Sequence, residues 1–535
     1  MTGTSVGHAR AQAERAMEAG DWAAARAGYA RILELEPARA DAMVQLSYVE
    51  SFAGRHRLAN DWALRAAALA PPSDPEAMLE LVRRLRTFNE TAALRAYAGR
   101  LLALPRAPRA VLVEAATQSS ILNDFDTAMR CAEAALRMAP DDPAARLVHG
   151  QLLAHHGRMD EAAAEFEQVL RRNPAVASGW WMLSRLRRQT AEANHVPQLQ
   201  SLLRAPGLRP ADAATAARAL HKELDDIGDH EGAWRALELM CRARRESTRY
   251  DPRAHRALID ALVAWRPADP AADAGAGRRP GEGRVPVFIV GMHRSGTTLL
   301  EQLLDASPEV RGIGELNDFP AALRHAADHY CKGPLDLGIV ERAASIDFAA
   351  LGRRYMDGVE WRLRGERFFT DKQPANFLGV GFICRALPQA KILHLVRDPV
   401  ETCFSNLREL YSGINEHSYD QLELADYFLQ YRRLMTHWHD AFPGRILDVS
   451  YSGLTRDPEA TMRGVAAHCG IAYVAGMSDP RSSGRAVSTA SSVQVRDRVV
   501  RRETPKWAPY AAHLQPLIRA LREGGAEVAE PAPER

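Results

Sequence analysis

The chain has 535 residues, roughly three times the length of an average domain, so we expect more than one compact domain. Hydrophobic residues make up 46% and charged residues 25%, which is typical of a globular protein. Lys and Arg number 69 against 67 for Asp and Glu, and this net charge of +2 argues against bulk charge as the means of holding nucleic acid or an anionic membrane.

The spacing of the cysteines and the composition of the N-terminus predict the cellular compartment of the protein. The six cysteines are far apart and form no C-x-x-C pair, which argues against a zinc module or a disulfide scaffold. The N-terminus has no apolar stretch of the kind found in secretory signals, and no apolar run reaches the length of a membrane span. We therefore expect a cytoplasmic protein.

The first half of the chain repeats itself with a period of 34 residues. Four units share a Gly or Asn at a turn, an alanine five residues later and a proline further on: Gly20–Ala25–Pro37, Gly54–Ala59–Pro71, Asn123–Ala128–Pro140 and Gly157–Ala162–Pro174. Gly and Asn tolerate a positive φ, alanine lets paired helices approach closely, and proline ends a helix. The pattern predicts pairs of helices.

This pattern resembles the tetratricopeptide repeat. The resemblance implies that residues 1–265 form an all-α solenoid with a concave surface. Such arrays bind a protein partner in the groove or act as spacers, and the sequence leaves both readings open. Residues 266–284 are rich in Pro, Gly and Ala and predict a flexible linker, while residues 523–535 predict a disordered tail.

A strand, a loop and a helix follow the linker. Val285 to Gly291 is a short apolar run typical of a buried parallel strand, and an amphipathic helix begins near Leu299. Loops of this kind bind phosphates through backbone N–H groups and the helix dipole. Gly291 and Gly296 have the spacing of a nucleotide triphosphatase loop, but Thr297 stands where lysine is required, which disfavours an ATPase or kinase.

Further strand ends carry cations or donors. The apolar run that begins at Lys391 ends in Arg397, another short run ends at Lys372, and the predicted strand in Arg445 to Leu454 has Tyr451 at its end. The carboxyl ends of parallel strands are where open α/β sheets bind ligands. Residues 285–522 therefore predict a three-layer α/β domain with a parallel sheet, similar to P-loop domains and suited to an anionic ligand.

These motifs, in this order, resemble the sulfotransferases that use 3′-phosphoadenosine 5′-phosphosulfate, with a C-terminal domain similar to tyrosylprotein sulfotransferases. The quoted segments are FIVGMHRSGTTLLEQLLDASPEVRGIGE, TDKQPANF, LPQAKILHLVRDP and STASSVQVR…KW. The resemblance implies catalytic roles for four residues: Glu315, Arg294, Lys372 and Ser491. Glu315 would be the general base, Arg294 would face the sulfonate, and Lys372 and Ser491 would stabilise the transition state.

The same resemblance implies contacts to the co-substrate. They would be made by His293, Arg294, Ser295, Gly296, Thr297, Thr298, Arg397, Ser405, Tyr451 and Lys506. Arg397 and Ser405 would bind the 3′-phosphate. The family's second arginine for that phosphate falls on Glu409, with Arg408 one residue earlier and about 100° away around a helix.

The expected reaction is sulfuryl transfer to a hydroxyl acceptor, which is a peptide, a saccharide or a small molecule; protein tyrosine is one candidate. With these cations in place the reaction needs no metal, and the histidines, among them His293, His394, His437 and His439, have no metal partners in sequence. Two alternatives stay open: a nucleotide-dependent phosphotransferase, and a repeat scaffold whose catalytic domain is inactive.

Overall fold

The computed structural model of the protein describes residues 2–267, 283–482 and 504–528. Most of the predicted linker, Ser491 and the end of the predicted tail lie outside these ranges. The chain divides into two compact units: Met1–Leu152 with Leu316–Trp361, and Leu153–Glu315 with Arg362–Arg535. The domain boundaries predicted from the sequence do not coincide with this division, and they remain a proposal about how the chain folds.

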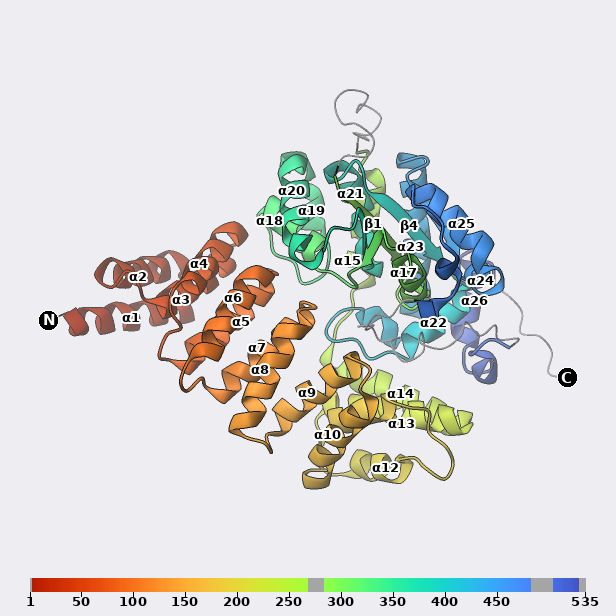
Figure 1. Ribbon diagram of the computed structural model, residues 1–535, viewed down its shortest axis with the longest axis horizontal. Helices are drawn as coiled ribbons and strands as arrows, with labels where there is room; N and C mark the ends of the chain where they lie inside the picture. Colours follow the sequence, from red (N-terminus) through yellow and green to blue (C-terminus); the bar gives the residue numbers. More distant parts are fainter. Residues whose placement is uncertain (1, 268–282, 483–503, 529–535) are drawn as a thin grey trace. The chain divides into compact units, whose positions relative to one another are not determined.

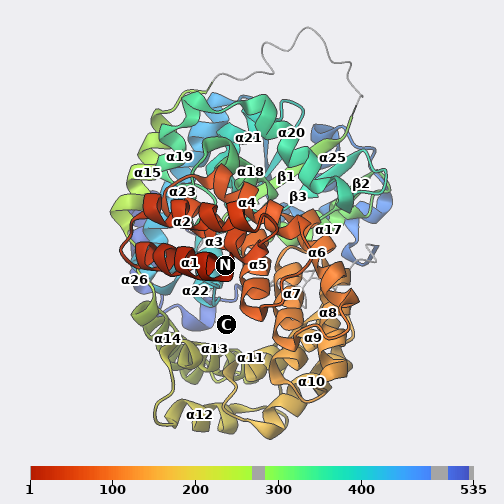
Figure 2. The same ribbon diagram turned by 90° about the vertical axis from the view of Figure 1, so that its left-hand side faces the viewer.

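The first unit is built from helical pairs, which follow one another in chain order (Figures 1 and 2). The pairs are α1 Thr2–Glu18 and α2 Trp22–Leu35, α3 Ala40–Phe52 and α4 His56–Ala68, α5 Pro75–Thr87 and α6 Thr91–Ala103, and α7 Arg109–Ile121 and α8 Phe125–Met138. Helix α9, Pro143–His155, begins in this unit and ends in the second. The segment 316–361 adds α18 Asp318–Ala327, α19 Leu337–Glu341 and α20 Phe348–Val359.

The turns of the repeat have the conformation that the sequence predicts. Gly20, Gly54, Asn123 and Gly157 have positive φ angles of 71°, 75°, 59° and 81°. The alanines five residues later, Ala25, Ala59, Ala128 and Ala162, are completely buried. Aspartates after two of these turns cap the next helix, since the side chains of Asp21 and Asp124 accept from the backbone N–H groups of Ala24 and Thr127. The all-α prediction for this part of the chain is confirmed.

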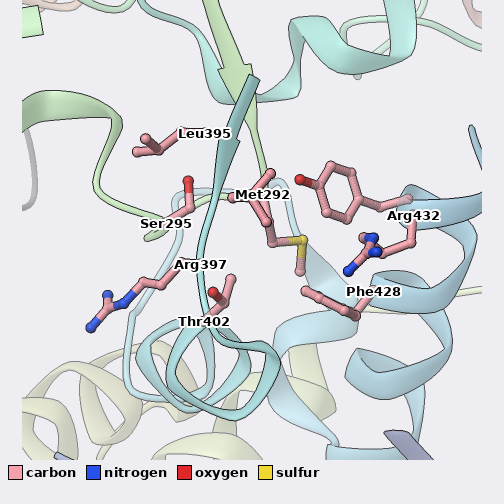
Figure 3. Close-up of a pocket in the computed structure, with 9 residues that line it drawn as sticks. Met292, Ser295, Leu395, Arg397, Thr402, Phe428 and Arg432 are labelled. Carbon is pink, nitrogen blue, oxygen red and sulfur yellow. The ribbon is translucent and has the colours of Figure 1, made fainter. Parts of the chain in front are cut away.

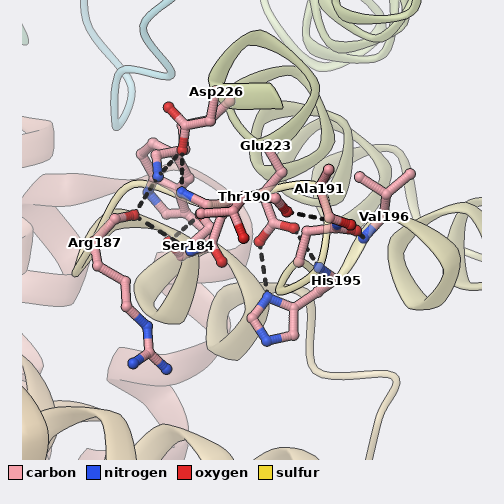
Figure 4. A network of polar contacts seen from close by, with 12 residues as sticks. Ser184, Arg187, Thr190, Ala191, His195, Val196, Glu223 and Asp226 are labelled. Carbon is pink, nitrogen blue, oxygen red and sulfur yellow. Dashed lines mark hydrogen bonds and ion pairs between the residues drawn. The ribbon is translucent and has the colours of Figure 1, made fainter. Parts of the chain in front are cut away.

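Helices of the second unit continue the helical part of the chain. They are α10 Met159–Arg172, α11 Ala177–Arg185, α12 Val196–Arg204, α13 Pro210–Ile227, α14 His230–Ser247 and α15 Pro252–Ala264. Between α11 and α12 the chain is irregular, and two carboxylates of α13 hold it (Figure 4). Glu223 accepts from the backbone N–H of His195 at 2.6 Å, and Asp226 accepts from that of Gln189 at 2.9 Å.

A parallel sheet of five strands forms the core of the rest of the second unit, in the order β2-β3-β1-β4-β5. The strands are β1 Val285–Gly291, β2 Val310–Gly312, β3 Phe368–Asp371, β4 Lys391–Val396 and β5 Ile446–Ser450. The helices are α17 Thr297–Asp305, α21 Val380–Ala386, α22 Pro399–Leu407, α23 Gln421–Ala441, α24 Tyr451–Arg456, α25 Pro458–Cys469 and α26 Gln515–Glu523.

Helices cover both faces of the sheet. On one face, leucines of α17 and apolar side chains of α25 pack against Val287, Ile289 and Leu393 of the strands. On the other, the ring of Tyr431 in α23 contacts His394 of β4. The predicted α/β domain with a parallel sheet is confirmed. Among the described residues, no helix combines the length and apolar character needed to cross a bilayer.

Candidate functional site

Two glycines shape the loop between β1 and α17. Gly291 has a φ of 150°, and a Cβ there would lie 2.9 Å from the carbonyl oxygen of Leu395 in β4. Gly296 has a φ of 106°, and a Cβ there would collide with the ring of Tyr451. Only glycine fits either position, because the backbone of the loop lies directly against β4 and the start of α24.

The loop offers donors suited to an anion. Arg294 has a φ of 66°, a left-handed conformation that is uncommon for a residue with a long side chain. Ser295 is buried and its hydroxyl has no hydrogen-bond partner within the described structure. Gly296 leaves the N-terminus of α17 without a side-chain cap, and Thr297 and Thr298 lie buried in its first turn. An orphaned hydroxyl beside an uncapped helix N-terminus fits a phosphate or sulfate group.

Glu315 and Lys372 meet at the ends of neighbouring strands. The ammonium group of Lys372 donates to Oε1 of Glu315 at 2.5 Å. The Lys372 side chain is completely buried, whereas that of Glu315 is 40% exposed. Glu301 of α17 holds both strand ends together, because its Oε1 accepts from the backbone N–H of Gly314 at 2.9 Å and from the Thr370 hydroxyl at 2.8 Å. The carboxylate is thus open to solvent while its cation is fixed.

His293, a residue of the loop, lies near the Glu315–Lys372 pair. Burial lowers the pKa of His293 to about 4, and the charges of Glu315, Lys372 and Arg294 are close enough to act on it. The side-chain amide of Asn406 donates to the carbonyl oxygen of His293 at 2.7 Å. Three residues that the sequence singled out, Glu315, Lys372 and Arg294, therefore lie within electrostatic reach of a fourth, His293.

Arg397 braces the loop. Its guanidinium donates to the carbonyl oxygen of Arg294 at 3.0 Å and to the carboxylate of Glu401, and it stacks over the ring of Tyr451 at 4.6 Å. Glu401 also accepts from the backbone N–H of Lys506 at 2.7 Å. Three of the predicted co-substrate residues, Arg397, Tyr451 and Lys506, are thus joined through this network. Ser491 lies outside the described residues.

Arg294 extends away from the sheet toward α22 and the residues after it. Its Nε donates to the hydroxyl of Ser405 at 3.3 Å, and its Nη1 lies 3.9 Å from Oε2 of Glu409. Arg218 of α13 approaches the same carboxylate at 4.0 Å and stacks over Trp181 at 4.4 Å. Burial lowers the pKa of Arg218 to about 10.

Arg408 takes a different direction. Its Nε donates to Nε2 of His221 at 2.8 Å, and its Nη2 donates to Asp225 at 2.5 Å. Burial alone would raise the pKa of Asp225, but Arg408 and the hydroxyl of Tyr510 bring it down to about 2. Arg408 is therefore engaged with α13, in keeping with its offset from the family position.

Sequence reasoning missed Arg218, Asn406 and Tyr411 as neighbours of the site. The Tyr411 hydroxyl donates to Oδ1 of Asn406 at 2.7 Å, and its ring packs edge-on against His293 at 5.7 Å. Asn406 follows Ser405 directly, so its place on α22 was a usable signal. Nothing in the sequence marks Arg218, which is separated from the loop by more than 70 residues.

A small pocket lies beneath the loop, between β4, α22 and α23. It is lined by Met292, Ser295, Leu395, Val396, Arg397, Thr402, Phe428, Tyr431 and Arg432. Figure 3 shows Ser295 and Arg397 on one side of β4, and Met292 and Phe428 on the other. The pocket has no room for a water molecule, so it is a packing gap that supports the loop and does not hold a nucleotide.

A group of possible metal ligands lies elsewhere in the second unit. His394, His439 and Asp448 bring three ligand atoms within 4.8 Å of one another. The fold, and not spacing along the chain, brings these three residues together, and the expectation that the reaction needs no metal stays a prediction. Burial lowers the pKa of His394; burial alone would raise the pKa of Asp448, but the His394 hydrogen bond lowers it.

Comparisons with known proteins find relatives for both the helical repeats and the α/β domain. Residues 286–475 match the sulfotransferase family, and residues 122–177 match the tetratricopeptide repeat. An uncharacterized protein of Aquifex aeolicus (strain VF5) is 28% identical over 407 residues, which are 73% of this chain and 51% of that protein. Protein-tyrosine sulfotransferase 2 of Gallus gallus is 26% identical over 201 residues, 35% of this chain and 51% of that protein.

The chain thus spans about half the length of these two curated relatives. Among solved structures, the sulfotransferase domain from the Synechococcus PCC 7002 olefin synthase aligns at 18% identity and a TM-score of 0.31, covering 48% of this chain and all of that domain. The chain thus contains, in this order, a segment similar to tetratricopeptide repeats and a segment similar to the sulfotransferase family.

Proposed function

We propose that the protein transfers a sulfuryl group from 3′-phosphoadenosine 5′-phosphosulfate to a hydroxyl acceptor. The observation that carries the proposal is the contact between Lys372 and Glu315 next to the loop of Arg294. A solvent-open carboxylate, a buried cation and an anion-binding loop are the three parts that an in-line transfer of a sulfuryl group requires.

Each residue has a defined task in this reaction. The acceptor oxygen attacks sulfur, a new O–S bond forms, and the bond from sulfur to the phosphate oxygen breaks, which releases 3′-phosphoadenosine 5′-phosphate. Glu315 takes the proton of the acceptor hydroxyl. Lys372 and Arg294 offset the negative charge that grows on the sulfonate and bridging oxygens. The predicted role of Ser491 belongs to the same proposal, and no step calls for a metal.

Binding of the co-substrate would use the loop and its braces. The orphaned Ser295 hydroxyl and the first turn of α17 suit the 5′-phosphosulfate, and Ser405 suits the 3′-phosphate. Arg397 would have to exchange part of its contact with Glu401 for that phosphate. Arg408 is left out of the site, because it is paired with Asp225.

For the acceptor we propose a polypeptide tyrosine as the first candidate to test. The name of the Gallus gallus relative supports it, and a groove of tetratricopeptide repeats suits an extended peptide. Saccharides and small phenols are the alternative acceptors, and they are assayed beside tyrosine peptides in the transfer experiment below. A protein partner in the groove and a cytoplasmic location stay predictions from the sequence.

The test begins with ligand binding. Thermal unfolding is compared for the protein with 3′-phosphoadenosine 5′-phosphate, with AMP, and with ATP and Mg²⁺. A ligand at 100 times its dissociation constant stabilises the folded state by about 2.7 kcal/mol. We expect only the 3′-phosphorylated nucleotide to stabilise. Stabilisation by ATP with Mg²⁺ alone would favour a phosphotransferase, and no stabilisation by any nucleotide would favour an inactive scaffold.

The catalytic part of the proposal is tested with Glu315→Gln. We expect this variant to bind 3′-phosphoadenosine 5′-phosphate as the wild type does and to lose at least about 10²-fold in transfer of ³⁵S-labelled sulfonate to tyrosine peptides, phenols and saccharides. Glu423→Gln is the control, because Glu423 pairs with Arg245 and has no part in the proposed reaction. Unchanged turnover in Glu315→Gln would remove Glu315 from the role of base.

A further inference from the structure

Two histidines and one aspartate converge at the edge of the sheet. His394 of β4 and Asp448 of β5 are direct partners across the two strands, and His439 lies in the last turn of α23. Nδ1 of His394 lies 2.7 Å from Oδ1 of Asp448, and Nε2 of His439 lies 2.8 Å from the same oxygen. Three separate elements thus deliver two imidazole nitrogens and a carboxylate to one point.

We propose that His394, His439 and Asp448 form a binding site for a transition-metal dication, with Zn²⁺ as the preferred ion. The proposal goes beyond sulfuryl transfer and does not depend on it. Neutral imidazole nitrogens with one carboxylate suit Zn²⁺, Co²⁺ or Ni²⁺, whereas Mg²⁺ and Ca²⁺ prefer sites made of oxygen ligands.

The distances are close to those of a metal site. Nitrogen and oxygen ligands lie about 2.0–2.2 Å from Zn²⁺, so neighbouring ligand atoms around a tetrahedral ion are separated by about 3.3–3.6 Å. The separations of 2.7 and 2.8 Å therefore need to open by about 0.5–0.9 Å. The side chains that must move can do so, because Asp448 is 55% and His439 36% exposed.

A second contact orients the buried ligand. The His394 side chain is only 3% exposed, and its Nε2 is hydrogen-bonded to the hydroxyl of Tyr431 in α23. Metal-bound histidines characteristically have such a partner on the nitrogen that does not bind the metal, because it fixes the ring and its tautomer. With Nε2 engaged in this way, Nδ1 is directed at Asp448. The exposed side of the cluster leaves room for water as the remaining ligand.

The site would act as a clamp. His394 precedes Arg397 by three residues on β4, and Asp448 precedes Tyr451 by three on β5, so an ion here would fix the two strands whose ends carry those residues. The positive charge of Arg432 would repel a bound cation, because it lies close enough to His394 to lower the pKa of that side chain. That repulsion is weakened by water, because Asp448 and His439 are open to solvent.

The competing account is that Asp448 merely bridges two histidines by hydrogen bonds. Binding of the metal alone decides between the two. The full-length protein is freed of metal with a chelator and titrated with Co²⁺, whose visible absorption reports coordination, and with Zn²⁺ by calorimetry. We expect saturation at one ion per chain, a higher melting temperature with Zn²⁺, and no saturable binding of Mg²⁺.

Three variants locate the ion. His439→Ala and Asp448→Asn should each weaken Zn²⁺ binding by more than about tenfold. His329→Ala is the matched control, because His329 forms a 2.8 Å pair with Asp336 that no third His, Cys or carboxylate of the described residues completes. If Asp448→Asn does not fold, the exposed His439→Ala carries the test. The proposal is overturned if Zn²⁺ does not saturate at one equivalent, or if His439→Ala binds it as tightly as the wild type.

Discussion

Replacing Lys372 by methionine should slow transfer strongly while leaving the fold nearly as stable as before. The Lys372 ammonium group is completely buried and lies 2.5 Å from the Glu315 carboxylate. At an effective dielectric constant of about 20, this separation corresponds to an attraction of about 7 kcal/mol. Burying the ammonium group costs several kcal/mol, and water screens the 40% exposed Glu315, so the terms nearly cancel.

We therefore expect Lys372→Met to change the free energy of unfolding by less than about 2 kcal/mol. The effect on the reaction should be larger, because the lost cation would act on charge that develops only in the transition state. Removing one such donor costs about 2.7–4 kcal/mol, or about 10²–10³-fold in turnover. The assays are urea unfolding and transfer of ³⁵S-labelled sulfonate to whichever acceptor the wild type uses.

Lys222→Met is the matched control for this experiment. Lys222 also forms a 2.5 Å pair with a carboxylate, that of Asp226, but it lies on α13 and has no part in the proposed reaction. It should lose stability and keep its turnover per folded molecule. If Lys372→Met retains turnover within fivefold of the wild type, the electrostatic role assigned to Lys372 is wrong.

Two more substitutions test the surroundings of the site. Glu409→Gln should lower the melting temperature of the free protein, because Arg218 and Arg294 lose the charge of their shared carboxylate. Adding 3′-phosphoadenosine 5′-phosphate should then raise the melting temperature of the variant by more than it raises that of the wild type. An equal or smaller rise would contradict the proposed pairing. Burial and Arg408 hold the pKa of His221 well below its ordinary value of 6.5, so below about pH 6.5 the unfolded chain takes up a proton that the folded chain does not. As the pH is lowered below about 6.5, the free energy of unfolding should fall by up to about 1.4 kcal/mol per pH unit. His221→Gln should make this fall shallower between about pH 7.5 and 5.5. An unchanged dependence of stability on pH would refute the role assigned to His221.

The sequence alone predicted the local structure well where one residue dictates the backbone. Positive φ angles occur at the turns of Gly20, Gly54 and Asn123 and in the loop at Gly291 and Gly296. Gly and Asn are the residues that adopt such angles most readily, so the residue types predict these turns. One turn was missed: Asn89 has a φ of 61° and lies 34 residues before Asn123. Leu94 and Arg106 stand where the other units have the alanine and the proline, and this concealed the turn, although the period was there to find it.

Element boundaries were less certain where two local signals compete. Tyr451 was predicted at the end of a strand that runs on to Leu454, but β5 ends at Ser450 and Tyr451 is the first residue of α24, because the hydroxyl of Ser450 caps the helix by accepting from the backbone N–H of Gly453. Strand β2 has only three residues and went unpredicted, since its pattern is too short to show a period. It nevertheless leads directly to Glu315.

Only the tertiary structure decided which distant side chains meet. Lys372 and Glu315 are 57 residues apart, and their contact depends on β2 and β3 being neighbours in the sheet. Asp448 joins His394 because β5 pairs with β4 in one register. Hydrophobic period and turn residues act over a few residues, so they specify the elements. Strand order and register are set by packing of the whole core, which no local pattern encodes.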